Sequence, residues 1–186
     1  LHGNSKVFGL PAAALAMYVT AKDKKKKVVA GLLLPAALTG FLTGITEPIE
    51  FTFLFAAPAL FVAHAVLGAA MSATMYGFGV VGNFGSGLID FLALNCIPMF
   101  KNHSSQMFVQ IAVGLTFSVI YFFVFRFMIL KFNLNTPGRE DDDAETKLYS
   151  KQEYREKGKE NAEAKPEVRD DSATHDDQAV IILEGL

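Results

Sequence analysis

Two carboxylates lie inside an otherwise apolar stretch of the sequence. Glu47 and Glu50 flank Pro48 in the octapeptide GITEPIEF, Gly44–Phe51, within an apolar tract that runs from residue 28 to residue 81. A charged side chain at bilayer depth costs about 2.5–3.5 kcal/mol on insertion scales, so such residues usually line a cavity. The octapeptide therefore predicts a binding site inside a membrane.

The backbone around these carboxylates is expected to be unwound. The residue before a proline is pushed out of the helical region, whereas proline itself suits the first position of a helix. We therefore expect Glu47 to be the last residue of an unwound stretch and a helix to begin at Pro48, with its positive end toward Thr46 and Glu47. Gly40 and Gly44 have no Cβ and allow this break.

Glu47 is the strongest candidate for ligand binding. A carboxylate accepts two hydroxyl hydrogen bonds from one ligand, and charge-assisted bonds are about twice as strong as neutral ones. The alternative is a buried acid satisfied by backbone or by a lysine. Glu50 lies nearly on the same helix face and either binds the ligand or holds the loop. Thr46 either donates to the ligand or bonds its own backbone, which is the commoner behaviour of threonine at a helix start.

Other polar residues in the apolar part are weaker candidates. Asp90, with Asn83 nearby in sequence, either caps a helix or contacts substrate. His64 lies on a long apolar face, where a satisfied core histidine is commoner than a ligand. Cys96 is the lone cysteine, so it offers neither a disulfide nor a metal cluster, and we expect it to pack. We expect no metal site and no cofactor, and no phosphate-binding loop, CxxC pair or nucleophile elbow occurs.

The composition divides the chain into two parts near Thr136. Apolar residues make up 51% of the 186 residues and mean hydropathy is +0.29, yet 19% are charged. Before Thr136, nine lysines or arginines face only four acids, so this part is net positive. From Thr136 onward, eight basic residues face fifteen acids, with few aromatics and no hydrophobic period. Such a stretch does not bury enough surface to offset its ordering entropy, so we expect a disordered acidic linker.

The apolar part predicts membrane helices of unequal length. Crossing about 30 Å of hydrocarbon takes about 20 helical residues, and only 107–130 meets this plainly, at roughly 36 Å. The stretch 8–20 is too short, and 28–44 is at the lower limit. The uncharged stretch 51–81 would reach roughly 46 Å, so it must tilt, bend or turn back. The stretch 88–100 is again too short to cross and is interpreted as part of a re-entrant segment lining the site.

The breaks and the charges complete this prediction. Pro58, Gly68 and the glycines between residues 77 and 87 are the places where the long stretch could bend. Positive charge marks the cytoplasmic side, and the candidates are the lysine run 22–27 and Lys131 with Arg139. We therefore predict an all-α integral membrane protein, a helical bundle with broken and re-entrant segments. The lysine run could also attract anionic lipid or a phosphorylated partner, although a topological anchor is the simpler account.

The octapeptide resembles the GITEPxEF signature of the membrane domain, EIIC, in the glucose superfamily of bacterial phosphotransferase-system sugar permeases. Three further segments support the resemblance: FGLPAAALAMY at 8–18, GLIDF at 87–91 and LNTPGRE at 134–140, where the linker of the family starts. The resemblance covers nearly the whole chain. It implies that residues 1–135 are the C-terminal part of EIIC, 136–174 a cytoplasmic linker and 175–186 the truncated start of an EIIB domain. The chain is then expected to be a fragment at both ends.

The resemblance also implies a mechanism. In the family, sugar binds in the membrane domain, and its 6-hydroxyl receives a phosphoryl group from an EIIB cysteine in a Cys-x-Thr-Arg motif. The full system is a protein-phosphohistidine–sugar phosphotransferase. Glu47 corresponds to the sugar-contacting acid, and it could equally act as the base that accepts the hydroxyl proton. The motif is absent here and Cys96 is not its cysteine, so this fragment alone should not catalyse the transfer.

The substrate and partners follow from the same resemblance. Loop sequences resemble the maltose and α-glucoside branch, with glucose or N-acetylglucosamine as the alternative. A second alternative is a non-phosphorylating sugar carrier or a sugar-sensing membrane protein. The expected partners are the sugar, the EIIB and EIIA phospho-donor domains, membrane lipid and a second copy in a homodimer, without nucleic acid. The expected location is the bacterial inner membrane, crossed several times, with the C-terminal tail in the cytoplasm.

Overall fold

The computed structural model describes residues 2–82 and 84–140, and these residues form helices and connecting turns without a strand. The helices, in chain order, are η1 (Ser5–Gly9), α1 (Leu10–Thr20), η2 (Asp23–Lys25), α2 (Lys26–Thr43), α3 (Glu47–Ala56), α4 (Pro58–Gly77), α5 (Leu88–Asp90), η3 (Phe91–Cys96), α6 (Ile97–Asn102) and α7 (Ser104–Lys131). The π-helical η1 continues directly into α1. Similarly, α5, η3 and α6 follow one another without interruption. The predicted all-α fold class is confirmed.

Three helices are long and apolar enough to cross a membrane. They are Asp23–Thr43, which joins η2 to α2, then Pro58–Gly77 and Ser104–Lys131. The prediction of a span at 107–130 is confirmed within α7, but the prediction that only this segment suffices is wrong. The span Asp23–Thr43 begins earlier than expected because it includes the lysines before residue 28. The aliphatic parts of these side chains can be buried while their ammonium groups stay in water. The tract 51–81, which was expected to be too long for one straight span, is divided at Ala57. Its second part is the 20-residue helix α4.

These spans are covered with exposed apolar side chains. Only 17–28% of the residues in the three spans are buried within the described structure. Large apolar residues such as Leu34, Val62 and Phe123 are more than 60% exposed. A helix that is apolar all round is stable only where its whole surface is removed from water, by protein or by lipid. This pattern therefore identifies an integral membrane protein.

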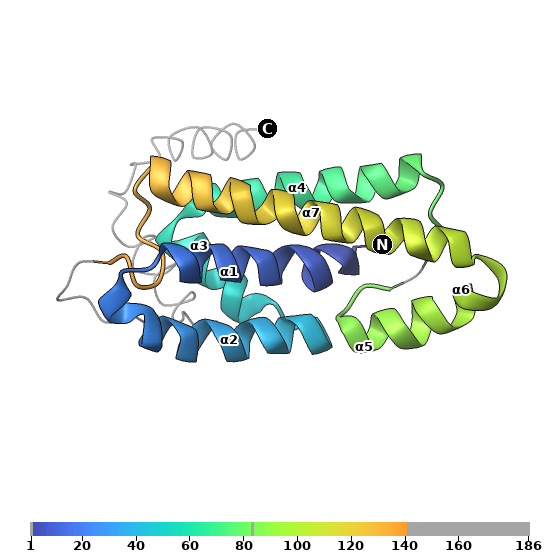
Figure 1. The fold of residues 1–186 in the computed structure, drawn as a ribbon, viewed down its shortest axis with the longest axis horizontal. Coiled ribbons are helices and arrows are strands. Elements are labelled where there is room, and N and C mark those ends of the chain that lie inside the picture. Colours follow the sequence, from blue (N-terminus) through green and yellow to red (C-terminus); the bar gives the residue numbers. More distant parts are fainter. Residues whose placement is uncertain (1, 83, 141–186) are drawn as a thin grey trace, which may run out of the picture. The chain divides into compact units, whose positions relative to one another are not determined.

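The helices pack around α1 and α7. Helix α1 contacts α2 on one side and α7 on another, while α7 also contacts α4, and α3 contacts α2 and α4. Figure 1 shows α4 and α7 running alongside each other, with α1 next to α7 and α2 next to α1. The main core between them includes Leu10, Met17, Phe53, Tyr121 and Phe125. A smaller core of Val7, Phe84 and Phe91 holds the residues just before α5 against η1 and η3.

The chain breaks at most of the predicted places. Helix α2 ends at Gly44, whose φ of 80° lies in the left-handed region that glycine adopts without strain. Ala57, with φ −154° and ψ 75°, separates α3 from α4 immediately before Pro58. Gly68 does not break α4. A Cβ there would lie 3.6 Å from the Tyr121 hydroxyl, which is an ordinary contact distance, so α4 continues through a position where alanine would also fit.

The helix after the break begins one residue earlier than predicted. Glu47, expected to be unwound, is the first residue of α3, and Pro48 follows in its first turn. The first N–H groups of a helix have no partner within it, so the missing proline N–H costs nothing at this second position. Thr46 is the cap, and its carbonyl oxygen accepts from the N–H of Glu50 at 2.9 Å.

The first residues of the predicted linker are packed against the turn between α1 and α2. Thr136 is fully buried, although its hydroxyl has no partner among the described residues. The Arg139 guanidinium donates to the Thr20 carbonyl oxygen at 3.2 Å, and the Lys22 N–H donates to the Gly138 carbonyl oxygen at 3.0 Å. The remainder of the predicted linker and the segment 175–186 lie outside the described residues.

Candidate functional site

The two broken elements of the fold meet backbone to backbone. A Cβ on Gly44, at the end of α2, would lie 2.6 Å from the Gly87 nitrogen, and a Cβ on Gly87 would lie 2.5 Å from the Gly44 nitrogen. Both distances are shorter than any real Cβ contact, so only glycine at these two positions permits the approach. The chain entering α3 and the chain entering α5 are thereby held together inside the bundle.

Thr46 and Glu47 lie beside this contact. Thr46 is buried and Glu47 is exposed. Neither side chain makes a hydrogen bond or an ion pair within the described part of the chain, and Thr46 does not cap α3 through its hydroxyl. Thr46 thus does not bond its own backbone, which was the commoner alternative. A hydroxyl and an unpaired carboxylate at the positive end of a helix can bind a ligand that both donates and accepts hydrogen bonds.

Lys6 contributes a cation next to the break. Its Nζ donates to the Gly44 carbonyl oxygen at 3.4 Å, and the side chain is half-buried. Lys6 and Gly44 are 38 residues apart in the sequence, so only the tertiary structure brings them together. In the sequence analysis Lys6 was only one of nine basic residues, and its place beside Gly44 was not predicted. A lone lysine in an apolar segment was the available signal.

Glu50, unlike Glu47, has a partner within the protein. Its carboxylate lies 3.8 Å from Nε2 of His64 on α4. The Tyr121 hydroxyl donates to the His64 carbonyl oxygen at 3.1 Å and lies 3.3 Å from its Nδ1. Phe53 and Phe61 also contact the imidazole. His64 is therefore a core histidine with partners, as expected, and Glu50 links α3 to α4 across their break.

Asp90 holds the loop in front of its own helix. One carboxylate oxygen accepts from the N–H groups of Gly85 and Ser86, each at 3.1 Å. This arrangement fixes the segment that leads to Gly87, so it favours the structural role over direct contact with substrate. Asn83, the other candidate in this region, lies outside the described residues.

A chain of buried amides connects Asn4, just before η1, to η3 and α7 and was not predicted. Gln110 on α7 donates to the Asn4 side-chain oxygen at 3.0 Å and accepts from the Asn95 side chain at 2.7 Å. Asn4 in turn lies 3.0 Å from the Met75 sulfur. All three amides are buried, and the Asn95 Oδ1 has no partner in the described part of the chain. Uncharged amides in apolar helices were the signal that could have revealed this network.

Metal ligands are not gathered anywhere in the described ranges. Within residues 2–82 and 84–140, no group of three His, Cys, Asp or Glu side chains is arranged to hold a metal ion. The site is built from one unpaired carboxylate, one hydroxyl, one ammonium group and backbone groups exposed by the helix break. Groups of these kinds can form hydrogen bonds with a polyhydroxylated ligand.

Comparison with known proteins relates the chain to EIIC components of the phosphotransferase system. Residues 1–69 match the family described as phosphotransferase system, EIIC. The chain is 60% identical over its whole length to the α-glucoside-specific EIICB component of Leptotrichia buccalis, covering 35% of that protein. It is 59% identical over its whole length to the maltose-specific EIICB component of Bacillus subtilis, covering 34% of it. Over 75% of its length it is 52% identical to the glucose-specific EIICBA component of Staphylococcus carnosus, 20% of which is covered. The chain thus spans about a third of the length of its α-glucoside and maltose relatives.

Proposed function

Because the chain belongs to the EIIC family of the phosphotransferase system, we propose that it forms the sugar-binding part of a permease that couples uptake to phosphorylation. The observation that carries this proposal is the unpaired Glu47 carboxylate at the break between α2 and α3, between helices that are long and apolar enough to cross a membrane. An unpaired charge within an apolar, membrane-spanning tract is costly unless a ligand or water satisfies it. A sugar supplies several hydroxyl donors at once.

The residues of the site have distinct roles in this proposal. Glu47 accepts hydroxyl hydrogen bonds, and Thr46 donates or accepts one more. Glu50 and Asp90 act mainly by holding α3 and the approach to Gly87 in place. A contact of either residue, or of Asn83, with the sugar stays part of the proposal and is tested by substitution.

The membrane domain supplies orientation rather than covalent chemistry. Holding the reacting hydroxyl where the phosphoryl donor arrives converts a bimolecular encounter into an effectively intramolecular step. Glu47 lies at the sugar and can also accept the proton that the hydroxyl loses. The donor cysteine belongs to an EIIB domain, which the names of the EIICB relatives include.

The proposed substrate is maltose or a related α-glucoside. The relatives with these names match over the whole chain at 59–60% identity, whereas the glucose-specific relative matches over 142 residues at 52%. Glucose therefore remains the second candidate. The proposed partners are EIIB and EIIA phospho-donor domains and a second copy of the chain. The proposed location is the bacterial inner membrane, with the tail in the cytoplasm, because the lysine run and Arg139 lie together.

The test is sugar phosphorylation by the full-length natural protein in membrane vesicles. Labelled maltose and labelled glucose are supplied with and without the phospho-donor proteins, for wild type and for Glu47→Gln. We expect donor-dependent maltose phosphate from the wild type and its loss in Glu47→Gln, with equal amounts of both proteins inserted in the membrane. Uptake without phosphorylation would instead identify a carrier and contradict the proposal. Normal phosphorylation by Glu47→Gln would show that Glu47 is structural.

A further inference from the structure

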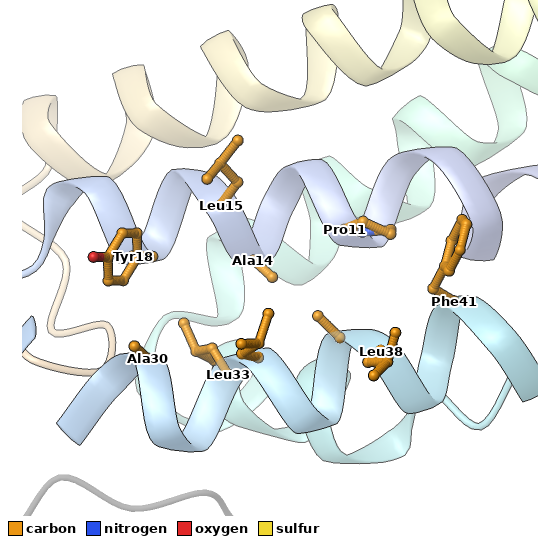
Figure 2. Close-up of a pocket in the computed structure, with 10 residues that line it drawn as sticks. Pro11, Ala14, Leu15, Tyr18, Ala30, Leu33, Leu38 and Phe41 are labelled. Atoms are coloured by element: carbon orange, nitrogen blue, oxygen red, sulfur yellow. The ribbon is translucent and has the colours of Figure 1, made fainter. Parts of the chain in front are cut away.

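An apolar groove between α1 and α2 lies apart from the sugar site. It has a volume of about 600 Å³ and is lined by side chains from α1 and α2, among them Ala14, Tyr18, Ala30, Leu34 and Phe41. Figure 2 shows Tyr18 and Ala30 at one end of the groove and Phe41 near the other end. Leu34 at its rim is 69% exposed, so the groove is open to its surroundings.

A run of lysines adjoins one end of this groove. The turn between α1 and α2 and the first turn of α2 carry five lysines, Lys22, Lys24, Lys25, Lys26 and Lys27. Part of this charge is already neutralised: Lys26 pairs with Asp23 at 2.8 Å, and Lys25 lies 4.0 Å from the Glu140 carboxylate. Lys24 and Lys27 are exposed and make no ion pair with the described residues. Two lysines are thus available to a negatively charged group.

The geometry of α2 aligns this charge with the groove. Lys27 lies three, seven and fourteen residues before Ala30, Leu34 and Phe41, so all four positions fall on one face of the helix. The groove from Ala30 to Phe41 is about 16 Å long at 1.5 Å per residue. Half of a hydrocarbon core of about 30 Å is the depth of one leaflet, so the groove has the length of an acyl chain in one leaflet.

We propose that this face binds an anionic phospholipid, with its phosphate at Lys24 and Lys27 and one acyl chain in the groove between α1 and α2. Basic clusters next to a membrane helix attract anionic lipid, and each lysine near the membrane surface contributes separately to this attraction. Charge complementarity favours this occupant over an apolar helix from another segment, because such a helix carries no negative group to pair with the lysines. The lipid site is distinct from the sugar site, because its lining residues include none of the groups around Glu47.

The proposal is tested by native mass spectrometry of the full-length natural protein released from detergent. The protein is titrated with dioleoyl phosphatidylglycerol and, separately, with dioleoyl phosphatidylcholine, which has the same chains without net charge. We expect the wild type to prefer phosphatidylglycerol. The double variant Lys24→Gln/Lys27→Gln should bind it about 30-fold more weakly, close to the level of phosphatidylcholine. Lys101→Gln, which removes an exposed lysine far along the sequence, should change the affinity by less than about twofold.

A second variant tests the groove independently of charge. Ala30→Phe fills the end next to the lysines and should weaken both lipids, whereas Ala73→Phe, at an exposed position on α4, should weaken neither. Unchanged phosphatidylglycerol binding in the double lysine variant would overturn the proposal. So would a double variant that binds lipid normally but loses donor-dependent phosphorylation, because the lysines would then dock a protein. Unchanged binding in a monodisperse Ala30→Phe protein would show that another segment of the protein covers the groove.

Discussion

The contact between Gly44 and Gly87 makes a sharp prediction for the substitution Gly87→Ala. Gly87 has φ −90° and ψ −160°, a conformation that alanine adopts without strain, so the backbone itself sets no penalty. The new Cβ, however, would lie 2.5 Å from the Gly44 nitrogen and 2.5 Å from the carbonyl group of Leu42. Ordinary contacts of this kind lie near 3.5–4.0 Å, so the two broken elements must separate by about 1 Å.

The expected consequence is a larger loss of function than of stability. Overpacking of this kind costs about 1–3 kcal/mol of folding free energy. A shift of about 1 Å in a group that orients the substrate can cost about 100-fold in rate. We therefore expect Gly87→Ala to insert and purify normally but to phosphorylate maltose roughly 100-fold more slowly. The assay compares donor-dependent phosphorylation rates at saturating and limiting maltose in vesicles of equal protein content.

The matched control is Gly31→Ala. Gly31 lies within α2, the helix that Gly44 caps, and a Cβ there would meet nothing within 4 Å. Alanine is the better helix former, so this variant should be neutral or slightly more stable. Wild-type rates in Gly87→Ala would refute the reasoning, because the glycine contact would then not position Thr46 and Glu47.

Further predictions concern the scaffold. Gly138 has φ 80°, and a Cβ there would lie 2.5 Å from the Val29 side chain, whereas Gly79 has φ 64° and open space around it. Gly138→Ala should therefore lower the unfolding temperature more than Gly79→Ala does. Equal shifts would show that the start of the linker is not packed against the turn between α1 and α2. Gln110→Leu should cost about 2–5 kcal/mol, because it leaves the Asn4 side-chain oxygen and the Asn95 NH2 group without the partner that they have in Gln110, and thermal unfolding in detergent measures this loss; no loss would mean that water replaces the amide. Glu50→Gln and His64→Phe should be coupled in a double-mutant cycle of stability while maltose affinity changes less than about threefold; additive effects, or a large loss of affinity in Glu50→Gln, would assign Glu50 to the sugar instead.

Local sequence chemistry predicted most of the breaks in the helices. Gly44 acts through its freedom to adopt a positive φ, and Pro58 acts by restricting the residue before it, so both effects are visible without tertiary structure. The start of α3 was misplaced by one residue because proline is tolerated throughout the first helical turn, not only at its first position. Gly68 was predicted as a possible bend but lies inside α4, because a single glycine does not by itself interrupt a helix.

Contacts between distant segments could not be predicted. Lys6 reaches Gly44 across 38 residues, and Glu50 meets His64 only because the break at Ala57 turns α4 back along α3. Composition predicted that residues from Thr136 onward are a solvated linker, since charge and low hydrophobicity average over a long window. The buried Thr136 shows that a few residues at its start form specific contacts that such an average conceals.

The central claim is that Glu47 holds the sugar. The most direct measurement is an experimental structure of the full-length natural protein with maltose bound. The account predicts sugar density at the break between α2 and α3, with a hydroxyl donating to the Glu47 carboxylate over about 2.5–2.7 Å. Sugar density elsewhere, with Glu47 paired to a protein cation or backbone, would contradict it.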